Sequence, residues 1–209
     1  MKVAVFGESD LDEEAVRILV DGILGKQTQS VDFRLRARGW PAVKDNLPAV
    51  LTHLHYRTDA EALVVIADSD DSPLHQADHE QPGNVNSECR LCGLLVAIGQ
   101  TLNRLAPVPG RATIKIAAGI AIPAIEAWFL CGSDPRASEA AWLQGGASMR
   151  GADFRKKLKR TLYGEDFAPQ AIRIRRVREE ALRLTQDLSL LESYFPNGFG
   201  PLAHAIRGW

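Results

Sequence analysis

Short apolar runs alternate along this chain with stretches of helical periodicity, and this alternation is the feature that most constrains its fold. The runs lie at residues 2–6, 62–67 and 112–122, and each is long enough for one strand. Because nearly every position in them is apolar, they are typical of strands buried on both faces of a parallel sheet. Residues 31–36 alternate apolar and polar side chains and predict a further strand with one face in water.

Helical patterns fill the intervals between these strands. Apolar residues recur on one face in 11–24 and 87–105, and 41–57 and 123–132 are also predicted to be helical. Asp10 is placed to cap the segment at 11–24 and Gly25 to end it, while Pro48 predicts a kink or break in 41–57. Such alternation of strands and helices implies an α/β fold, with a mostly parallel sheet and helices on both faces.

Composition restricts the class of protein further. The chain has 209 residues, of which 45% are hydrophobic and 24% charged, which suits one large globular domain or one domain with an extension. No apolar run approaches the roughly 20 residues needed to span a bilayer, and the first residues lack a signal-peptide pattern. Three cysteines, an odd number, argue against a disulfide framework. We therefore expect a cytoplasmic protein without a membrane partner.

Charge divides the chain into two parts. Residues 1–149 carry 13 Lys and Arg against 19 Asp and Glu, whereas residues 150–209 carry 12 against 7. We interpret 1–149 as the α/β domain and 150–209 as a basic helical extension packed on it. An acidic body with a basic extension favours a nucleic-acid partner, although exposed helices rich in Lys and Arg are the alternative. The candidate nucleic-acid-binding residues are Arg155, Lys156, Lys157, Lys159, Arg160, Arg173, Arg175 and Arg176.

Carboxylates follow two of the predicted strands at the point where each strand ends. Glu8 comes soon after the first, and Asp68, Asp70 and Asp71 directly follow the run at 62–67. The carboxyl ends of parallel strands meet at one edge of a sheet, so these side chains should converge there and raise one another's pKa. A divalent cation such as Mg²⁺ would relieve the repulsion. The alternatives are a solvated turn at 70–72 and ordinary helix-capping acids at 10–14.

Four motifs resemble those of Toprim-fold proteins. "GESD" (7–10) and "ADSDD" (67–71) look like the glutamate and the Asp-x-Asp that bind Mg²⁺ in that family. "IPAIEAWFL" (122–130) and "FPNGFGPLAHAI" (195–206) are similar to segments of small, mostly uncharacterised Toprim-like relatives of OLD-type nucleases.

The resemblance covers most of the chain and implies a Toprim-like, Rossmann-like sheet. It also implies a hydrolase that cleaves phosphodiesters with Mg²⁺ or Mn²⁺, acting in phage defence, with Glu8, Asp68, Asp70 and Glu126 as the metal ligands. One feature departs from the family pattern, because Phe6 stands where the family glutamate precedes the glycine. We expect Glu8, Asp68 and Asp70 to be catalytic, and Lys115, which is polar within an apolar strand, to stabilise developing charge.

A second group of residues has metal-ligand spacing. His75 and His79 are four residues apart, and Cys89 and Cys92 form a C-x-x-C sequence. Two His and two Cys within eighteen residues can close a tetrahedral structural zinc site that holds the polar loop at 72–86. A redox-active cysteine pair, or cysteines and histidines with no special role, are the alternatives.

Two other functions compete with a nuclease. A degenerate Toprim-like subunit could bind nucleic acid or an ATPase without catalysis, and the phenylalanine at position 6 favours it. A receiver-like module could be phosphorylated on Asp68, because it too would gather carboxylates where the strands of a parallel sheet end. The chain is long for such a module, and Glu126 and the basic extension would have no role in it.

Overall fold

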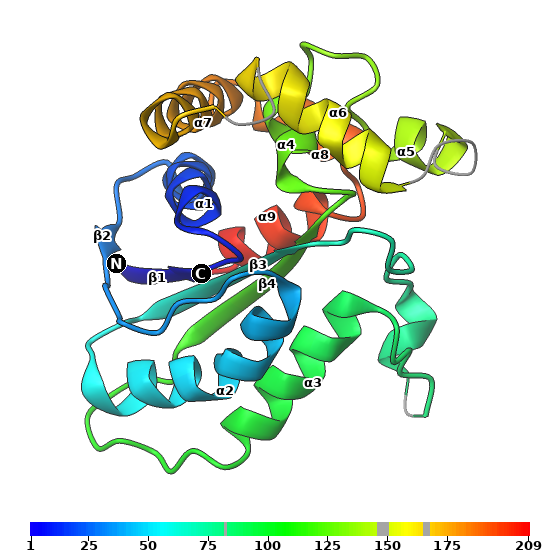
Figure 1. Cartoon of the computed structure of the whole chain (residues 1–209). Helices are drawn as coiled ribbons and strands as arrows, with labels where there is room; N and C mark the ends of the chain where they lie inside the picture. The colour runs from blue at the N-terminus through cyan, green and yellow to red at the C-terminus, as the bar shows by residue number, and fades with distance from the viewer. Residues whose placement is uncertain (82, 146–150, 165–167) are drawn as a thin grey trace.

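The computed structural model places the three predicted apolar runs side by side in one sheet. It describes residues 1–81, 83–145, 151–164 and 168–209. The strands are β1 (Lys2–Phe6), β2 (Gln29–Ser30), β3 (Ala62–Asp68) and β4 (Lys115–Ala121). They are all parallel and lie in the order β2-β1-β3-β4 (Figure 1). The α/β class with a parallel sheet and helices on both faces is therefore confirmed.

The register of the strands decides which residues share an edge of the sheet. Phe6 pairs with Val65, and Asp68 pairs with Ala121, so β1, β3 and β4 all end on the same side. Lys115 pairs with Ala62 at the opposite end of the sheet. The loops that follow the three strands therefore meet at one edge, which we call the carboxyl edge.

Successive side chains of each strand enter two different hydrophobic cores, as the period of two in a strand requires. Val3 and Val5 belong to one core, and Ala4 and Phe6 to the other. The first core is closed by α1 (Asp10–Leu24) and by helices from the second half of the chain. The second is closed by α2 (Trp40–Arg57) and α3 (Arg90–Leu102), which lie on the opposite face of the sheet (Figure 1).

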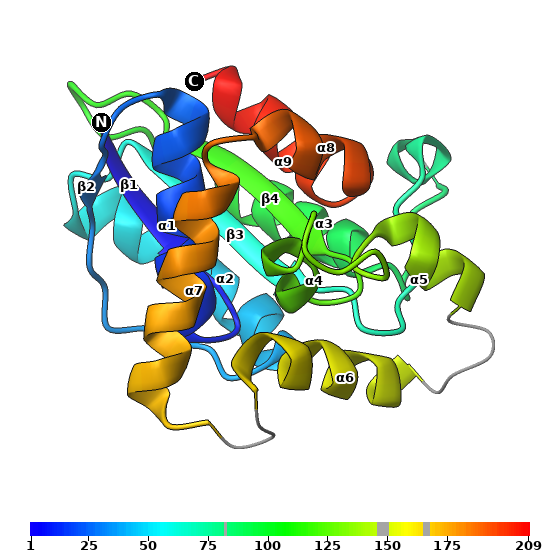
Figure 2. The ribbon, with the colours of Figure 1, turned by 90° about the horizontal axis from the view of Figure 1, so that it is seen from above.

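The elements that the structure describes after β4 are all helices, as expected for residues 123–132 and for the last sixty residues. They are α4 (Ile125–Phe129), α5 (Glu139–Gly145), α6 (Gly151–Tyr163), α7 (Gln170–Leu184), α8 (Leu188–Tyr194) and α9 (Phe199–Arg207). Helix α7 lies alongside α1, and α6 crosses near the carboxyl edge (Figure 2). Trp128 of α4 packs edge-on against Phe195 and Phe199, so helices after residue 150 share a core with the sheet. The predicted boundary at 149–150 falls outside the described residues.

Local details differ from the sequence-based expectations. The strand expected at residues 31–36 is not formed, because pairing with β1 ends at β2. Val31 and Phe33 still bury their side chains, but the segment that carries them is not a strand of the sheet. Of the kink or break expected at Pro48, the break is not found, because α2 continues from Trp40 to Arg57. Pro48 lies on the exposed face of α2, where water can hydrate a carbonyl group that loses its hydrogen bond. Helix α1 is capped by Ser9 rather than Asp10 and ends at Gly25, which has a φ of 63°.

The segment before α9 lies against the outer strand of the sheet. Glu139, buried on α5, accepts hydrogen bonds from the backbone N–H groups of Asn197 (3.0 Å) and Gly198 (2.6 Å). A methyl group at Gly198 would lie 2.6 Å from the carbonyl oxygen of Ile120 in β4, so this approach requires glycine. The adjacent Ala121 carbonyl accepts a bond from Ser69, on the β3 side, so the Ile120 carbonyl faces the outer side of β4.

Within the described ranges, none of the helices combines the length and apolar character required to cross a membrane.

Candidate functional site

Glu8 and Asp68 meet at the carboxyl edge, as their positions after two neighbouring strands predict. Glu8 Oε1 accepts a hydrogen bond from the Asp68 N–H at 2.9 Å. Asp68 Oδ1 accepts one from the Ile125 N–H, at the start of α4, at 2.8 Å. These two bonds fasten the loop after β1 to the end of β3, and the end of β3 to α4. Glu8 therefore reaches the site from its position after Gly7, although Phe6 is fully buried against Phe33.

Glu126 and Asp12 complete the group, and we call these four carboxylates, Glu8, Asp12, Asp68 and Glu126, the acidic cluster. Glu126 is only 5% exposed, and its Oε2 is buried without a hydrogen-bond partner. Asp12 accepts a bond from the Ser9 hydroxyl at 2.8 Å. A buried carboxylate oxygen without a hydrogen-bond partner is energetically costly.

The pKa values of the acidic cluster show how strongly these groups resist ionisation together. Burial raises the pKa of Asp12 to about 7, and the neighbouring charges of Glu126 and Glu8 add to the rise. Burial, followed by the charges of Glu126, Asp12 and Glu8, raises the pKa of Asp68 well above its ordinary value. Burial also raises the pKa values of Glu8 and Glu126. Perturbed carboxylates gathered at a strand edge are typical of functional sites.

Helix α6 brings two cations to this edge. The Lys159 ammonium lies 3.7 Å from Glu126 Oε1, and the charges of Glu126, Asp68 and Asp12 raise the pKa of Lys159. The Arg155 guanidinium lies 3.0 Å from Asp70 Oδ1 and donates to Asp71 Oδ1 at 3.0 Å. Both residues were predicted to bind nucleic acid, which stays a prediction; in this structure they are paired with carboxylates.

Asp70 forms ion pairs with Arg90 and Arg155, and Arg90 also lies 3.8 Å from Glu8 Oε1. Asp70 has a left-handed backbone with φ of 48°, and its Oδ2 lies 2.6 Å from Nη2 of Arg90. Arg90 also donates from Nη1 to the Asp68 carbonyl at 2.7 Å and stacks over the Trp40 ring at 5.1 Å. A surface groove of about 430 Å³ lies beside Trp40, Asp70, Arg90 and Arg155.

Convergence of Glu8, Asp68 and Asp70 on one point is therefore not found. Among the described residues, the acidic side chains do not form a group of three or more oxygen ligands close enough to share an ion. The oxygen donors of the acidic cluster are nevertheless of the type that Mg²⁺ and Mn²⁺ prefer.

The predicted catalytic role of Lys115 does not agree with the structure. Lys115 opens β4 at the end of the sheet opposite the carboxyl edge, and its ammonium group donates to the backbone carbonyl of Trp209. Six residues of strand separate it from Ala121, which corresponds to about 20 Å. A side chain at that position cannot stabilise charge at the acidic cluster.

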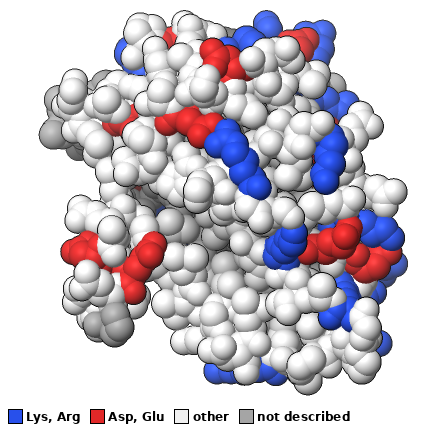
Figure 3. Space-filling model, turned by 180° about the vertical axis from the view of Figure 1, so that it is seen from behind, with Lys and Arg blue, Asp and Glu red and all other residues white. Residues whose placement is uncertain are grey.

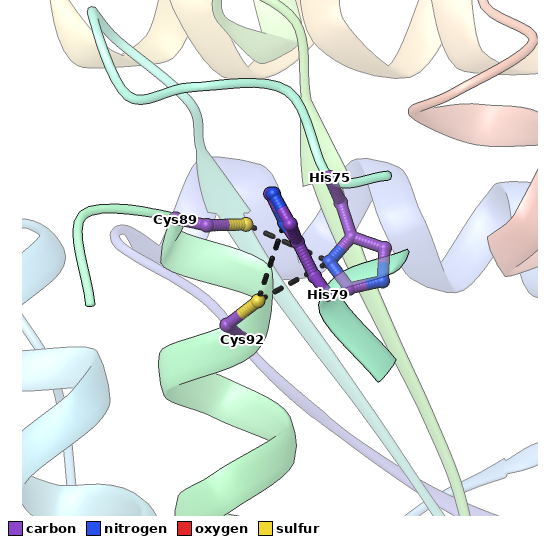
Figure 4. A group of neighbouring side chains, drawn as sticks. All are labelled: His75, His79, Cys89 and Cys92. Atoms are coloured by element: carbon purple, nitrogen blue, oxygen red, sulfur yellow. Dashed lines mark hydrogen bonds between the residues drawn. The ribbon is translucent and has the colours of Figure 1, made fainter. Parts of the chain in front are cut away.

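The four predicted zinc ligands do come together, and we call His75, His79, Cys89 and Cys92 the His/Cys cluster. Their ligand atoms all lie within 4.8 Å of one another (Figure 4). Both cysteines are buried and neither forms a disulfide, while the histidines come from the loop and from a short 3-10 turn, η1 (Ala77–Glu80). Burial raises the pKa of the Cys89 thiol. This cluster could bind a metal ion such as zinc.

The remaining predicted nucleic-acid contacts lie on α6 and α7. Lys156, Lys157 and Arg160 are exposed on α6. On α7, Arg173 stacks over Tyr163 at 5.1 Å, and Arg175 and Arg176 both approach Glu179. On the face shown in Figure 3, Lys and Arg lie in small groups mixed with Asp and Glu, so that face does not supply a basic surface.

Two residues of the site were not anticipated. Asp12 was expected to serve the N-terminus of α1, because acids there are common for dipole reasons alone. Its spacing of four from Glu8 was the available signal. Arg90 was not singled out, and its position inside the C-x-x-C sequence gave no sign that it would reach Asp68 and Asp70.

A scan against protein-family models found no match, and searches of curated proteins and of solved structures found none either. The fold and the two clusters therefore define an α/β protein with a parallel sheet, an acidic carboxyl edge and a His/Cys group.

Proposed function

We propose that this chain is a Toprim-type hydrolase that cleaves phosphodiester bonds of nucleic acid with Mg²⁺ or Mn²⁺. The observation that carries the proposal is the acidic cluster, with the partnerless Oε2 of buried Glu126. Glu8, Asp68 and Glu126 would have to move closer together than in this structure to hold the cation, which would supply an activated water and a Lewis acid. Zn²⁺, in contrast, is assigned to the His/Cys cluster as a structural ion.

The chain's own residues would bind and orient the substrate. Arg90 and Arg155 line the groove beside the acidic cluster and can bind a phosphate, and Trp40 in the same groove offers a ring for a base. Asp70 holds both guanidinium groups, so it orients them in this arrangement. Its predicted role as a metal ligand requires its carboxylate to leave Arg155.

The position of Glu8 supports an active rather than a degenerate site. The family glutamate is replaced by the buried Phe6, yet the Glu8 carboxylate touches the backbone of Asp68. A receiver-like role for Asp68 has less support, because its Oδ1 accepts the Ile125 N–H within a buried setting. The biological setting that we propose, from the motif resemblance alone, is defence against phage.

A cleavage assay tests the proposal. Labelled single- and double-stranded DNA and RNA are incubated with the wild type, Asp68→Asn, Glu126→Gln and the exposed control Asp45→Asn. We expect cleavage that needs Mg²⁺ or Mn²⁺, unchanged in the control and reduced more than about 100-fold in the two site variants. Cleavage without added cation, or equal in all variants, would refute the assignment.

One observation favours a second function, that of a non-catalytic partner of nucleic acid or of an ATPase. Lys159 and Arg155 already neutralise carboxylates at the carboxyl edge, so α6 can stabilise the fold without a metal. The same assay separates the two functions. Binding of the labelled nucleic acids with no cleavage under any cation would favour the partner.

A further inference from the structure

We propose that the His/Cys cluster binds one structural Zn²⁺ ion and that this ion, by fixing the first turn of α3, holds Arg90 against the Asp68–Asp70 loop. The proposal links a metal site to the acidic edge through a single side chain. It concerns the folded structure, so it stands whether or not the acidic cluster is catalytic.

The distances within the cluster agree with tetrahedral ligation. Zn–S bonds of about 2.3 Å and Zn–N bonds of about 2.0–2.1 Å place sulfur and nitrogen ligands about 3.6 Å apart at the tetrahedral angle. His75 Nδ1 lies 3.6 Å from Cys89 Sγ and 3.4 Å from Cys92 Sγ. His79 Nδ1 lies 3.6 Å from Cys92 Sγ. These separations leave the four ligand atoms around one centre, as Figure 4 shows.

The outer contacts of the cluster also suit a metal. His75 presents Nδ1 to the sulfurs, while its Nε2 lies 3.2 Å from Glu80 Oε1. A carboxylate on the second ring nitrogen is the partner that metal-bound histidines commonly have, because it fixes the ring and its tautomer. Cys89 precedes α3 and Cys92 lies in its first turn, so both thiols stand at the same end of one helix, where a C-x-x-C pair can bind a single ion.

The segment between the ligands is held by local hydrogen bonds, such as those of the capping box at η1, and not by a hydrophobic core. Among the described residues from 76 to 88, no side chain is buried, and η1 contributes none to a core. Hydrophobic burial therefore cannot fix this segment, whereas ligation at both of its ends can. Two thiolates with two imidazoles suit Zn²⁺, and they do not suit Mg²⁺ or Ca²⁺, which take oxygen ligands.

Arg90 carries the effect of the metal to the acidic edge. It stands between the two cysteine ligands, one residue after Cys89 and two before Cys92. Its guanidinium bonds to the Asp68 carbonyl at 2.7 Å and to Asp70 at 2.6 Å. A metal that fixes the turn on both sides of Arg90 thus also fixes the base of this side chain.

Metal analysis tests the first half of the proposal. The full chain is prepared without a metal-affinity tag from zinc-supplemented cells and dialysed against metal-free buffer. We expect about one zinc per chain in the wild type and in the control His53→Asn, and less than about 0.2 in Cys92→Ser and His79→Asn. His79 is only partly buried, so circular dichroism should show that its variant keeps the fold. Less than about 0.2 zinc per chain in the wild type would overturn the site, also where the protein is isolated with a Cys89–Cys92 disulfide. Full zinc content in both ligand variants would overturn it as well.

Hydrogen–deuterium exchange tests the second half. We expect exchange of backbone amides in residues 68–74 to rise about tenfold when a chelator removes zinc, and similarly in zinc-loaded Arg90→Gln. The control Arg104→Gln, an exposed arginine just after α3, should exchange like the wild type. Unchanged exchange after zinc removal would show that the ion does not act on the acidic edge. Because neither readout is catalytic, a failure here is distinct from a failure of the proposed hydrolysis.

Discussion

Replacing Asp12 by Asn should stabilise the folded chain at alkaline pH. The side chain lies within the acidic cluster, where Glu126, Glu8 and Asp68 surround it with like charge. Asn is isosteric and can still accept the bond from the Ser9 hydroxyl. The substitution therefore removes a charge and changes little else.

The size of the effect follows from the pKa of Asp12. It rises from the ordinary 3.8 to about 7 on folding, and each pKa unit corresponds to about 1.4 kcal/mol, so the upper limit is about 4 kcal/mol. Because Asp12 is only partly buried by surface area, solvent screening should reduce this to about 1–3 kcal/mol. The folded chain holds the proton more tightly than the unfolded chain. The contribution of Asp12 to stability is therefore complete below pH 3.8 and is lost as the pH rises through about 7.

Urea unfolding followed by circular dichroism, in metal-depleted buffer at pH 5 and pH 8, measures the effect. Asp12→Asn should exceed the wild type most at pH 8, and its advantage should shrink at pH 5, where the folded wild type is already protonated. Asp45→Asn, on the exposed face of α2, should match the wild type at both values. Equal destabilisation by Asp12→Asn at both pH values would refute the reasoning and leave Asp12 as a partner of the helix cap.

Three further predictions concern the cation, the basic surface and the core. Added Mg²⁺ should raise the melting temperature of the wild type because it binds the folded state, and Glu126→Gln should reduce that shift; an undiminished shift would place the ion elsewhere. Lys157→Glu and Arg160→Glu, both exposed on α6, should each flatten the salt dependence of nucleic-acid binding by roughly one unit, as measured by fluorescence anisotropy. Trp128→Ala should lower the free energy of unfolding by about 3–5 kcal/mol in urea titrations, because this fully buried ring packs on Phe195 and Phe199; a loss below about 1 kcal/mol would contradict that packing.

The strands β1, β3 and β4 could be predicted because runs of apolar residues bounded by polar ones have few alternatives in a helix-rich chain. The strand at 31–36 could not be distinguished from an extended segment, since Val31 and Phe33 alternate in both. The break predicted at Pro48 was wrong for a similar reason, because the sequence alone does not show that this side of the helix faces water.

The candidate site was partly predictable for topological reasons. Glu8 and Asp68 meet because parallel strands end at one edge, and the His/Cys cluster meets because its members are close in sequence. The pairing of Lys159 with Glu126 depends on where α6 packs, which no local pattern encodes. Lys115 was misassigned because the strand was expected to begin at residue 112, whereas β4 begins at Lys115, at the end of the sheet opposite the carboxyl edge.

The close approach of Gly198 to Ile120 covers part of an outer strand of the sheet. An outer strand with unpaired carbonyl and amide groups is a template onto which a strand of another molecule can add. Here the seven-residue strand β4 has the chain before α9 against its outward carbonyl, and the opposite border of the sheet, β2, is only two residues long. A larger residue at position 198 would push the chain before α9 away from β4 and expose the outer edge of this strand. We therefore expect a larger residue at position 198 to make edge-to-edge association of β4 easier.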